Sequence, residues 1–259
     1  MGEALPEAPG TATIQADRLV MRYAGGRLAL HGVSLAVRRG ELTVVLGANG
    51  SGKSTLLRII AGIVKPTEGT ARVAGREITG LTGRALADAR MATGMIFQHA
   101  NLVKRRSVLA NVLCGTLGRN RSLATALGVL PPGEVPHAMR CLADVGLHEF
   151  AAQRAGTLSG GQAQRAAIAR ALAQRPLALL ADEPVASLDP DATAQVMRLL
   201  RHVAADEGMA VLCVLHQPEL ARRYADRILG LRQGVLAFAA RPDETTDAAI
   251  DALYEGAPR

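Results

Sequence analysis

Three short segments of the chain are almost entirely apolar, and each ends at a glycine or a polar residue. They span residues 42–46, 177–181 and 210–215. A strand buried on both faces has this appearance, because neither set of alternate side chains meets water. Residues 33–37 instead alternate between apolar and polar, which is typical of a strand with one exposed face.

Segments with apolar residues at helical spacing lie between these strands. They predict helices at residues 52–60, 160–174 and 191–207. Residues 70–78 predict a short pair of strands, and residues 102–150 are mostly helical in pattern with prolines as breaks. Buried strands that alternate with helices indicate a parallel sheet covered on both faces, so the predicted fold class is α/β.

Composition narrows the class without choosing a function. Hydrophobic residues make up 49% of the 259 positions and aromatic residues only 2%, so the core is expected to be aliphatic. The cysteines, at 114, 141 and 213, are isolated, which fits neither a disulfide framework nor a zinc site. The net charge of +7 permits nucleic acid, acidic lipid or phosphorylated ligands.

The sequence also limits how the chain meets a membrane. No apolar run approaches the roughly 18 residues that a membrane-spanning helix needs. The first ten residues are acidic and proline-rich, unlike an export signal, which is basic and then apolar. We therefore expect any membrane role to be peripheral.

The segment that follows the strand at 42–46 has the phosphate-binding pattern of two glycines six apart followed by Lys and Ser. It comprises Gly47, Ala48, Asn49, Gly50, Ser51, Gly52, Lys53 and Ser54. Glycines let successive N–H groups point at phosphate oxygens, and the start of the next helix adds the positive end of its dipole. Lys53 is expected to meet the β- and γ-phosphates, and Ser54 to offer a hydroxyl to Mg²⁺.

Two carboxylates, Asp182 and Glu183, follow the buried strand at 177–181. The carboxyl ends of parallel strands face the ligand crevice, so both acids are expected beside the phosphate loop. Asp182 is predicted to hold Mg²⁺ through water, and Glu183 to orient or deprotonate an attacking water. The alternative, a solvated acidic turn, becomes much weaker once the phosphate loop is taken into account.

A second turn suited to phosphate precedes the predicted helix at 160–174. Its residues are Leu158, Ser159, Gly160, Gly161 and Gln162. Alone they indicate no more than a helix cap and hinge. Lying between the phosphate loop and the carboxylates, they complete a set of motifs that resembles the ATP-binding subunits of ABC transporters over residues 12–234.

That resemblance implies a P-loop NTPase (RecA-like) core with a mostly parallel sheet, an antiparallel β subdomain and an inserted helical subdomain. The implied limits are an N-terminal tail at 1–11, an ABC ATP-binding domain at 12–236 with the helical subdomain at 98–164, and a C-terminal tail at 237–259. The polar residues from 241 onward predict that this tail is peripheral.

The resemblance also implies a head-to-tail homodimer with two ATP molecules at its interface. The phosphate loop of one copy, together with Thr55, would hold each ATP from one side. The other copy would contribute Ser159, Gly160, Gly161 and Gln162. Asp189 resembles a residue of the loop that crosses between copies.

Further matches complete the implied site. Tyr23 lies where an aromatic ring stacks on adenine, Gln98 where a glutamine contacts Mg²⁺ and the attacking water, and His216 where a histidine contacts the γ-phosphate. The expected catalytic residues are therefore Lys53, Gln98, Glu183 and His216. The expected metal ligands are Ser54, Gln98 and Asp182.

A closer match, over residues 97–103, 107–113, 181–189, 215–217 and 220–227, resembles the phosphonate-import subunit. It implies a separate integral-membrane permease, a periplasmic phosphonate-binding protein and a place on the cytoplasmic face of a bacterial inner membrane. Importers of phosphate, phosphite or another small anion remain open, because His99–Ala100 and Pro218–Glu219 depart from the pattern. Residues 101–117 are predicted to belong to the surface that docks the permease.

Two rival classes remain. The basic charge permits a nucleic-acid-associated ABC protein, but such proteins usually carry two cassettes or a long coiled-coil insertion, so we expect no nucleic-acid partner. A cassette that binds ATP without hydrolysing it is the second rival. The presence of Lys53, Asp182, Glu183 and His216 argues against it.

Overall fold

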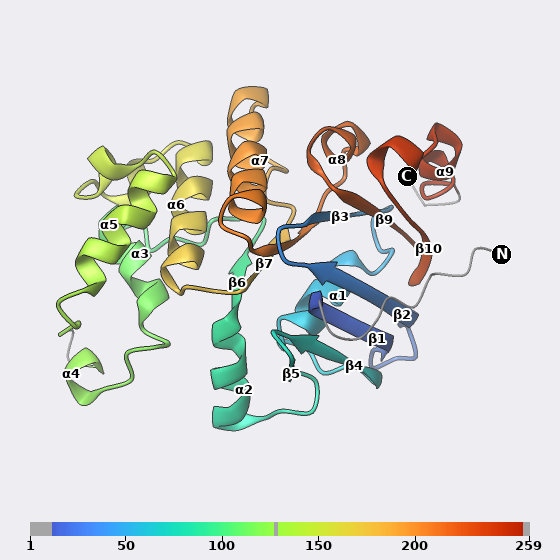
Figure 1. Ribbon diagram of the computed structural model, residues 1–259, viewed down its shortest axis with the longest axis horizontal. Coiled ribbons are helices and arrows are strands. Elements are labelled where there is room, and N and C mark those ends of the chain that lie inside the picture. The colour runs from blue at the N-terminus through green and yellow to red at the C-terminus, as the bar shows by residue number, and fades with distance from the viewer. Residues whose placement is uncertain (1–11, 127–128, 256–259) are drawn as a thin grey trace.

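A six-stranded sheet forms the centre of the computed structural model (Figure 1), which describes residues 12–126 and 129–255. The predicted tail at 1–11 lies outside the described residues. The strand order is β10–β9–β3–β8–β7–β6. Neighbours are parallel except β10, which is antiparallel to β9. The strands are β3 (Leu42–Leu46), β6 (Thr93–Ile96), β7 (Ala178–Asp182), β8 (Ala210–Val214), β9 (Arg227–Arg232) and β10 (Val235–Ala240).

The three apolar segments form the adjacent strands β3, β8 and β7 in the middle of this sheet, and every residue of β3 and β8 is buried. A mostly parallel sheet is therefore confirmed. Its two faces build two separate cores: Val44 packs into one cluster and Val45, its neighbour along the strand, into the other. Alternate side chains of one strand thus stabilise opposite halves of the molecule, which is why the pattern is continuously apolar.

An antiparallel sheet of four strands, in the order β2–β1–β4–β5, lies beside the central sheet. Its strands are β1 (Ala12–Arg22), β2 (Leu28–Arg38), β4 (Glu68–Val73) and β5 (Arg76–Glu77). The strand predicted at 33–37 is the second half of β2, and the pair predicted at 70–78 corresponds to β4 and β5. This sheet and α1 enclose one core, to which Ile14, Leu30 and Leu57 contribute with no exposed surface.

The helices group on both sides of the central sheet. They are α1 (Lys53–Ile60), α2 (Gly83–Ala89), α3 (Val108–Leu113), α4 (Leu123–Ala126), α5 (Glu134–Asp144), α6 (Gly160–Ala173), α7 (Pro190–Ala205), α8 (Pro218–Tyr224) and α9 (Asp247–Asp251). The predicted helices at 52–60, 160–174 and 191–207 correspond to α1, α6 and α7. Helices α3, α5 and α6 pack on one another at the left of Figure 1. None of the helices in the described ranges is long and apolar enough to cross a bilayer.

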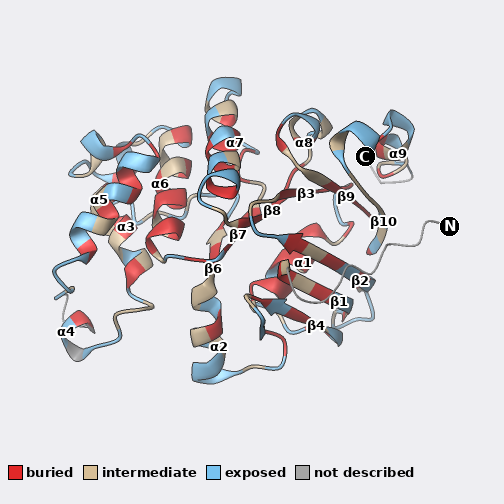
Figure 2. Ribbon diagram, viewed as in Figure 1, coloured by how far each residue is buried: buried red, intermediate tan, exposed pale blue. Residues whose placement is uncertain are grey.

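The C-terminal residues correct one predicted limit, because the tail expected at 237–259 begins inside a strand of the main sheet. Residues 235–240 form β10, a strand of the main sheet, and α9 then contacts α8, where Arg222 pairs with Asp247. Ile250 and Leu253 are 5% and 2% exposed, and Figure 2 shows buried positions reaching into this segment. The polar composition concealed two apolar anchors spaced three residues apart, one helical turn.

Candidate functional site

The phosphate loop folds as it does because two of its glycines have no room for a side chain. Gly47 has a φ of 153°, and a Cβ there would lie 2.1 Å from the carbonyl oxygen of Leu231. Gly52 has a φ of 107°, and its Cβ would lie 2.5 Å from the carbonyl oxygen of Ala29. The backbones of β9 and β2 therefore lie against the loop, and only glycine permits so close an approach.

Open hydrogen-bonding groups line the loop. Helix α1 begins after Gly52 with no side-chain cap and no acidic residue in its first turn, so its first N–H groups are available to an anion. The Ser51 hydroxyl is buried and has no hydrogen-bond partner among the described residues. These features fit a bound phosphate group.

Lys53 places its charge inside this loop. Its Nζ donates to the carbonyl oxygens of Gly47, at 2.7 Å, and Ala48, at 2.9 Å. Burial lowers the pKa of Lys53, and the nearby carboxylates of Glu183 and Asp182 act in the opposite direction. The lysine is thus a buried cation that donates its hydrogen bonds to neutral carbonyl oxygens. A polyphosphate that binds here would form a charge-assisted hydrogen bond with it.

Asp182 contacts the phosphate loop at Ser54, so that a hydroxyl oxygen and a carboxylate oxygen lie together. The Ser54 hydroxyl donates to Asp182 Oδ1 at 3.0 Å. Burial raises the pKa of Asp182, and the Ser54 hydrogen bond partly offsets that effect. A hydroxyl beside a half-buried carboxylate is a hard oxygen pair of the kind that suits Mg²⁺.

Glu183 and His216 form a second pair next to the first. Strands β7 and β8 pair with Asp182 opposite Val214, so the residues that follow each strand emerge side by side. His216 Nε2 lies 2.5 Å from Glu183 Oε1. Glu183 has a φ of 52°, a left-handed conformation that costs a residue with a side chain about 1–3 kcal/mol. This conformation accompanies the contact of its carboxylate with the histidine. We call residues 47–54 with Asp182, Glu183 and His216 the phosphate surface.

The Ser159 turn and the Asp189 loop form another surface, which we call the Ser159 surface (residues 159–162 and 189). Ser159 caps α6 with a full capping box that includes Gln162, and Asp189 caps α7 by accepting from the N–H of Ala192 at 2.8 Å. The two helix starts touch, since a Cβ on Gly161 would lie 2.7 Å from Ala192 Cβ. No hydrogen bond or ion pair in residues 12–126 and 129–255 joins this surface to the phosphate surface.

The remaining predicted residues, Tyr23 and Gln98, lie at the border of the phosphate surface. The Tyr23 hydroxyl is 3.1 Å from Thr55 Oγ1, which fixes its ring beside the first turn of α1. Gln98 is exposed and leaves β6 at the same sheet edge as Asp182, because Ile96 pairs with Ala181. The structure does not bring Gln98 into hydrogen-bond contact with that carboxylate.

Sequence reasoning missed two residues of α6 that hold the Gln98 segment. Gln164, only 3% exposed, donates to the carbonyl of Phe97 at 3.0 Å. Arg170 donates to the carbonyls of Ala100 and Asn101 at 2.7 and 2.8 Å. Helix α6 therefore carries the Ser159 turn at its start and grips the Gln98 segment along its length. The available signal was a pair of polar residues on a helix otherwise rich in alanine.

Comparison with known proteins places these features in a family context. A family model described as "ABC transporter" matches residues 30–186. The chain is 48% identical over 245 residues to a phosphite import ATP-binding protein of Stutzerimonas stutzeri, covering 95% of this chain and 88% of that protein. It is 43% identical to a phosphonates import ATP-binding protein of Halalkalibacterium halodurans, covering 93% and 99%.

A solved structure gives the same match in three dimensions. It is the dimeric ATP-binding cassette MJ0796 in a post-hydrolysis state, bound to ADP and inorganic phosphate. The TM-score is 0.77 at 32% identity, covering 88% of this chain and 98% of that one.

Proposed function

The chain belongs to the ABC transporter family of ATP-binding subunits, and we propose that it drives import of phosphonate or phosphite through a separate permease. It hydrolyses ATP as an importer subunit. One observation carries the assignment of its chemistry: the Ser54–Asp182 and Glu183–His216 pairs stand side by side at the mouth of the phosphate loop. Such a grouping positions a phosphate chain and a water for in-line attack.

Each residue of the phosphate surface then has a separate task. Lys53 and the N–H groups of the loop bind the β- and γ-phosphates and neutralise charge that grows during transfer. Glu183 orients the attacking water, and His216 holds that carboxylate in place and faces the γ-phosphate. Ser54 and Asp182 would hold Mg²⁺, with Gln98 approaching from the neighbouring strand end. Bound Mg²⁺ would supply charge neutralisation at the reacting phosphate.

Substitution of Glu183 tests this chemistry. Glu183→Gln keeps the shape of the side chain and its hydrogen bond to His216, but it removes the negative charge that polarises water. We expect ATP binding to remain and phosphate release to fall about 10²–10³-fold. Glu149→Gln, at an exposed glutamate in the helical region, is the matched control. Hydrolysis by Glu183→Gln at the wild-type rate would refute the assignment.

The Ser159 surface is proposed to complete the site of a second copy. Two identical chains related by a two-fold axis would each offer Ser159 and Gly161 to the ATP on the partner's phosphate loop. In support, the residues Ser159 and Gly160 at the start of α6 are exposed, and the adjoining Asp189 loop, also exposed, lies on the same surface. Removal of the γ-phosphate would then release the two copies from each other.

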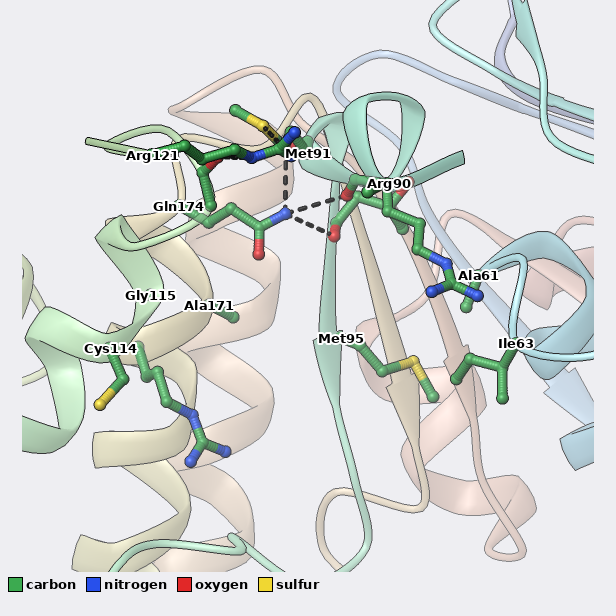
Figure 3. Close-up of a pocket in the computed structure, with 14 residues that line it drawn as sticks. Ala61, Ile63, Arg90, Met91, Met95, Cys114, Gly115, Arg121, Ala171 and Gln174 are labelled. Carbon is green, nitrogen blue, oxygen red and sulfur yellow. Dashed lines mark hydrogen bonds between the residues drawn. The ribbon is translucent and has the colours of Figure 1, made fainter. Parts of the chain in front are cut away.

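A groove between the helical group and the rest of the molecule is the proposed docking site of the permease (Figure 3). Its volume is about 500 Å³. The apolar side chains of Ile63, Met91 and Met95 line it, and in Figure 3 those of Met95 and Ile63 point toward one another. Arg90 also lines it, and Arg121 lines it while paired with Asp88, so an amphipathic permease segment with a carboxylate near Arg90 would fit. The lining includes part of the predicted docking segment 101–117, at Cys114 and Gly115.

Co-purification with the permease tests the groove. Ile63 is 50% exposed, so Ile63→Glu should fold normally and place a charge where apolar contact is proposed. We expect permease co-purification to fall at least tenfold while ATP hydrolysis by the isolated subunit is unchanged. Val235→Glu, at a residue 48% exposed on β10, should retain the permease. Equal retention by both variants would place the docking surface elsewhere.

The transported ligand is the finer question, since the motor does not contact it. Phosphonate follows from the sequence match at residues 97–103, 215–217 and 220–227, and phosphite from the relative with 48% identity. Uptake assays in cells that carry the whole transporter, with an alkylphosphonate or phosphite as sole phosphorus source, separate the two. If cells grow on one of the two compounds and lose that growth with Glu183→Gln, that compound is the ligand. Growth on neither compound refutes the substrate class.

We expect the subunit to be peripheral, on the cytoplasmic face of the inner membrane.

A further inference from the structure

The C-terminal segment reaches the phosphate surface through a single tyrosine. The Tyr254 hydroxyl donates to the main-chain carbonyl oxygen of His216 at 3.3 Å. Burial raises the pKa of Tyr254, and a hydrogen bond with the backbone of Gly47 lowers it in part. The same hydroxyl therefore bonds to the backbone of His216 and lies near that of Gly47, the first residue of the phosphate loop.

Several contacts fix the position of that tyrosine. Leu253, next to it in the chain, is 2% exposed and belongs to the core cluster that also contains Leu215. Arg222 of α8 pairs with Asp247 at 2.5 Å and donates to the carbonyl of Thr245 at 3.2 Å. Residues 245–253 are thus held by contacts before and after α9, and these contacts fix the position of Tyr254.

His216 needs such support because it stands in a short connection. It lies between the end of β8 and Pro218, the first residue of α8. Its ring must meet Glu183 Oε1, so any rotation of its backbone moves the carboxylate that orients water. A misplacement of about 1 Å in a catalytic group is costly for the rate, even when the fold is intact.

We propose that Tyr254 is a positioning residue that fixes the His216 loop against the phosphate loop, so that the C-terminal segment sets the rate of hydrolysis. The inference rests on the role proposed above for Glu183 and His216. Tyr254 does not touch the nucleotide in this account. It acts through the carbonyl of His216 and leaves the binding of ATP to other residues.

Tyr254→Phe removes the hydroxyl and keeps the ring. We expect kcat for ATP to fall about threefold to tenfold, the size of effect that one hydrogen bond produces, with KM within about twofold of wild type. Tyr224→Phe is the control, because Tyr224 is a buried tyrosine at the end of α8 that is not placed in the site. Leu253→Ala removes a buried contact that fixes the position of Tyr254, so it should lower both Tm and kcat.

A double-mutant cycle separates positioning from general stability. In a His216→Ala background, measured by single-turnover assays at high enzyme concentration, Tyr254→Phe should produce no further loss of rate. Hydrogen exchange should rise at residues 215–217 in Tyr254→Phe and not in Tyr224→Phe. An undiminished kcat in Tyr254→Phe, or an equal loss with and without His216, would overturn the inference. Wild-type hydrolysis by His216→Ala would instead refute the site assignment on which it rests.

Discussion

The phosphate surface and the Ser159 surface are built from similar parts and held in opposite ways. Both start from a glycine-containing turn at the N-terminus of a helix. In the phosphate surface, side chains from β7, β8 and α1 meet through the Ser54–Asp182 and Glu183–His216 hydrogen bonds. In the Ser159 surface the side-chain hydrogen bonds are local, because they lie within the caps of α6 and α7.

The difference shows that the phosphate surface is preorganised for catalysis and that the Ser159 surface is preorganised for contact with a second chain. A buried cation, a half-buried acid of raised pKa and a strained glutamate all gather in the phosphate surface, and perturbed groups concentrate where catalysis occurs. On the Ser159 surface, Ser159, Gly160 and Asp189 are exposed. A single chain therefore holds one half of a site in place and displays the other half outward.

The largest expected effect is the removal of charge from the phosphate surface. Lys53→Ala should reduce ATP hydrolysis about 10²–10³-fold, because a positioned cation at the transferring phosphate is lost. It should weaken ATP binding as well, since the lysine contacts ground state and transition state alike. Lys65→Ala, at an exposed lysine beyond α1, should behave as wild type in steady-state assays. Comparable activity in the two variants would remove Lys53 from the site.

Next in size is a charge placed on the Ser159 surface. Asp caps a helix as well as Ser does, so Ser159→Asp should preserve Tm within about 1–2 °C. Its carboxylate would face the partner's triphosphate, and like charges in contact cost several kcal/mol, so hydrolysis should fall about 10²-fold. ATP binding to the monomer, measured by calorimetry, should not change. Ser159→Thr is the uncharged control, and full activity in Ser159→Asp would show that this turn never meets a nucleotide.

A smaller effect is expected where α6 links the two surfaces. Arg170→Lys keeps the charge and loses the two-carbonyl grip on Ala100 and Asn101. We expect kcat to fall about threefold to tenfold, the value of a hydrogen bond or two. Arg198→Lys, at an exposed position of α7, is the control. An unchanged kcat in Arg170→Lys would mean that the Gln98 segment needs no such support.

The smallest effect concerns stability and has the opposite sign. The pKa of Asp182 is raised by burial, so its ionised form destabilises the folded chain at neutral pH. Asp182→Asn should therefore raise Tm at pH 7 in the absence of nucleotide, while it impairs Mg²⁺-dependent hydrolysis. The gain in Tm should shrink as the pH falls toward 3.8, the ordinary value for this carboxyl. A Tm at pH 7 equal to or below that of wild type contradicts this account of the buried acid.

Local pattern was enough to predict the centre of the fold. The strands β3, β7 and β8 are mostly apolar because each separates two cores, and α7, which follows β7, begins at the Asp189 cap that is visible in sequence. The roles expected for Lys53, Ser54, Asp182 and Glu183 depend on strand ends that meet at one edge. Such convergence follows from parallel pairing alone.

Features that depend on distant contacts were beyond sequence reasoning. The left-handed backbone of Glu183 accompanies its contact with His216, and the grip of Arg170 depends on a loop that lies far from it in sequence. The packing of Leu253 and Tyr254 depends on the core cluster that contains Leu215, which is far from them in sequence. A polar segment with two apolar anchors has no periodicity strong enough to reveal this packing.

The central claim is that two chains enclose each nucleotide, and the mass of an ATP-trapped complex tests it most directly. Glu183→Gln with ATP and Mg²⁺, measured by size-exclusion chromatography with light scattering, should have twice the mass of one chain and contain two ATP molecules. Adding Ser159→Asp to the same variant should return the mass to that of a monomer. A Glu183→Gln chain that binds ATP and stays monomeric at every concentration, or a dimer that is indifferent to Ser159→Asp, would contradict the account.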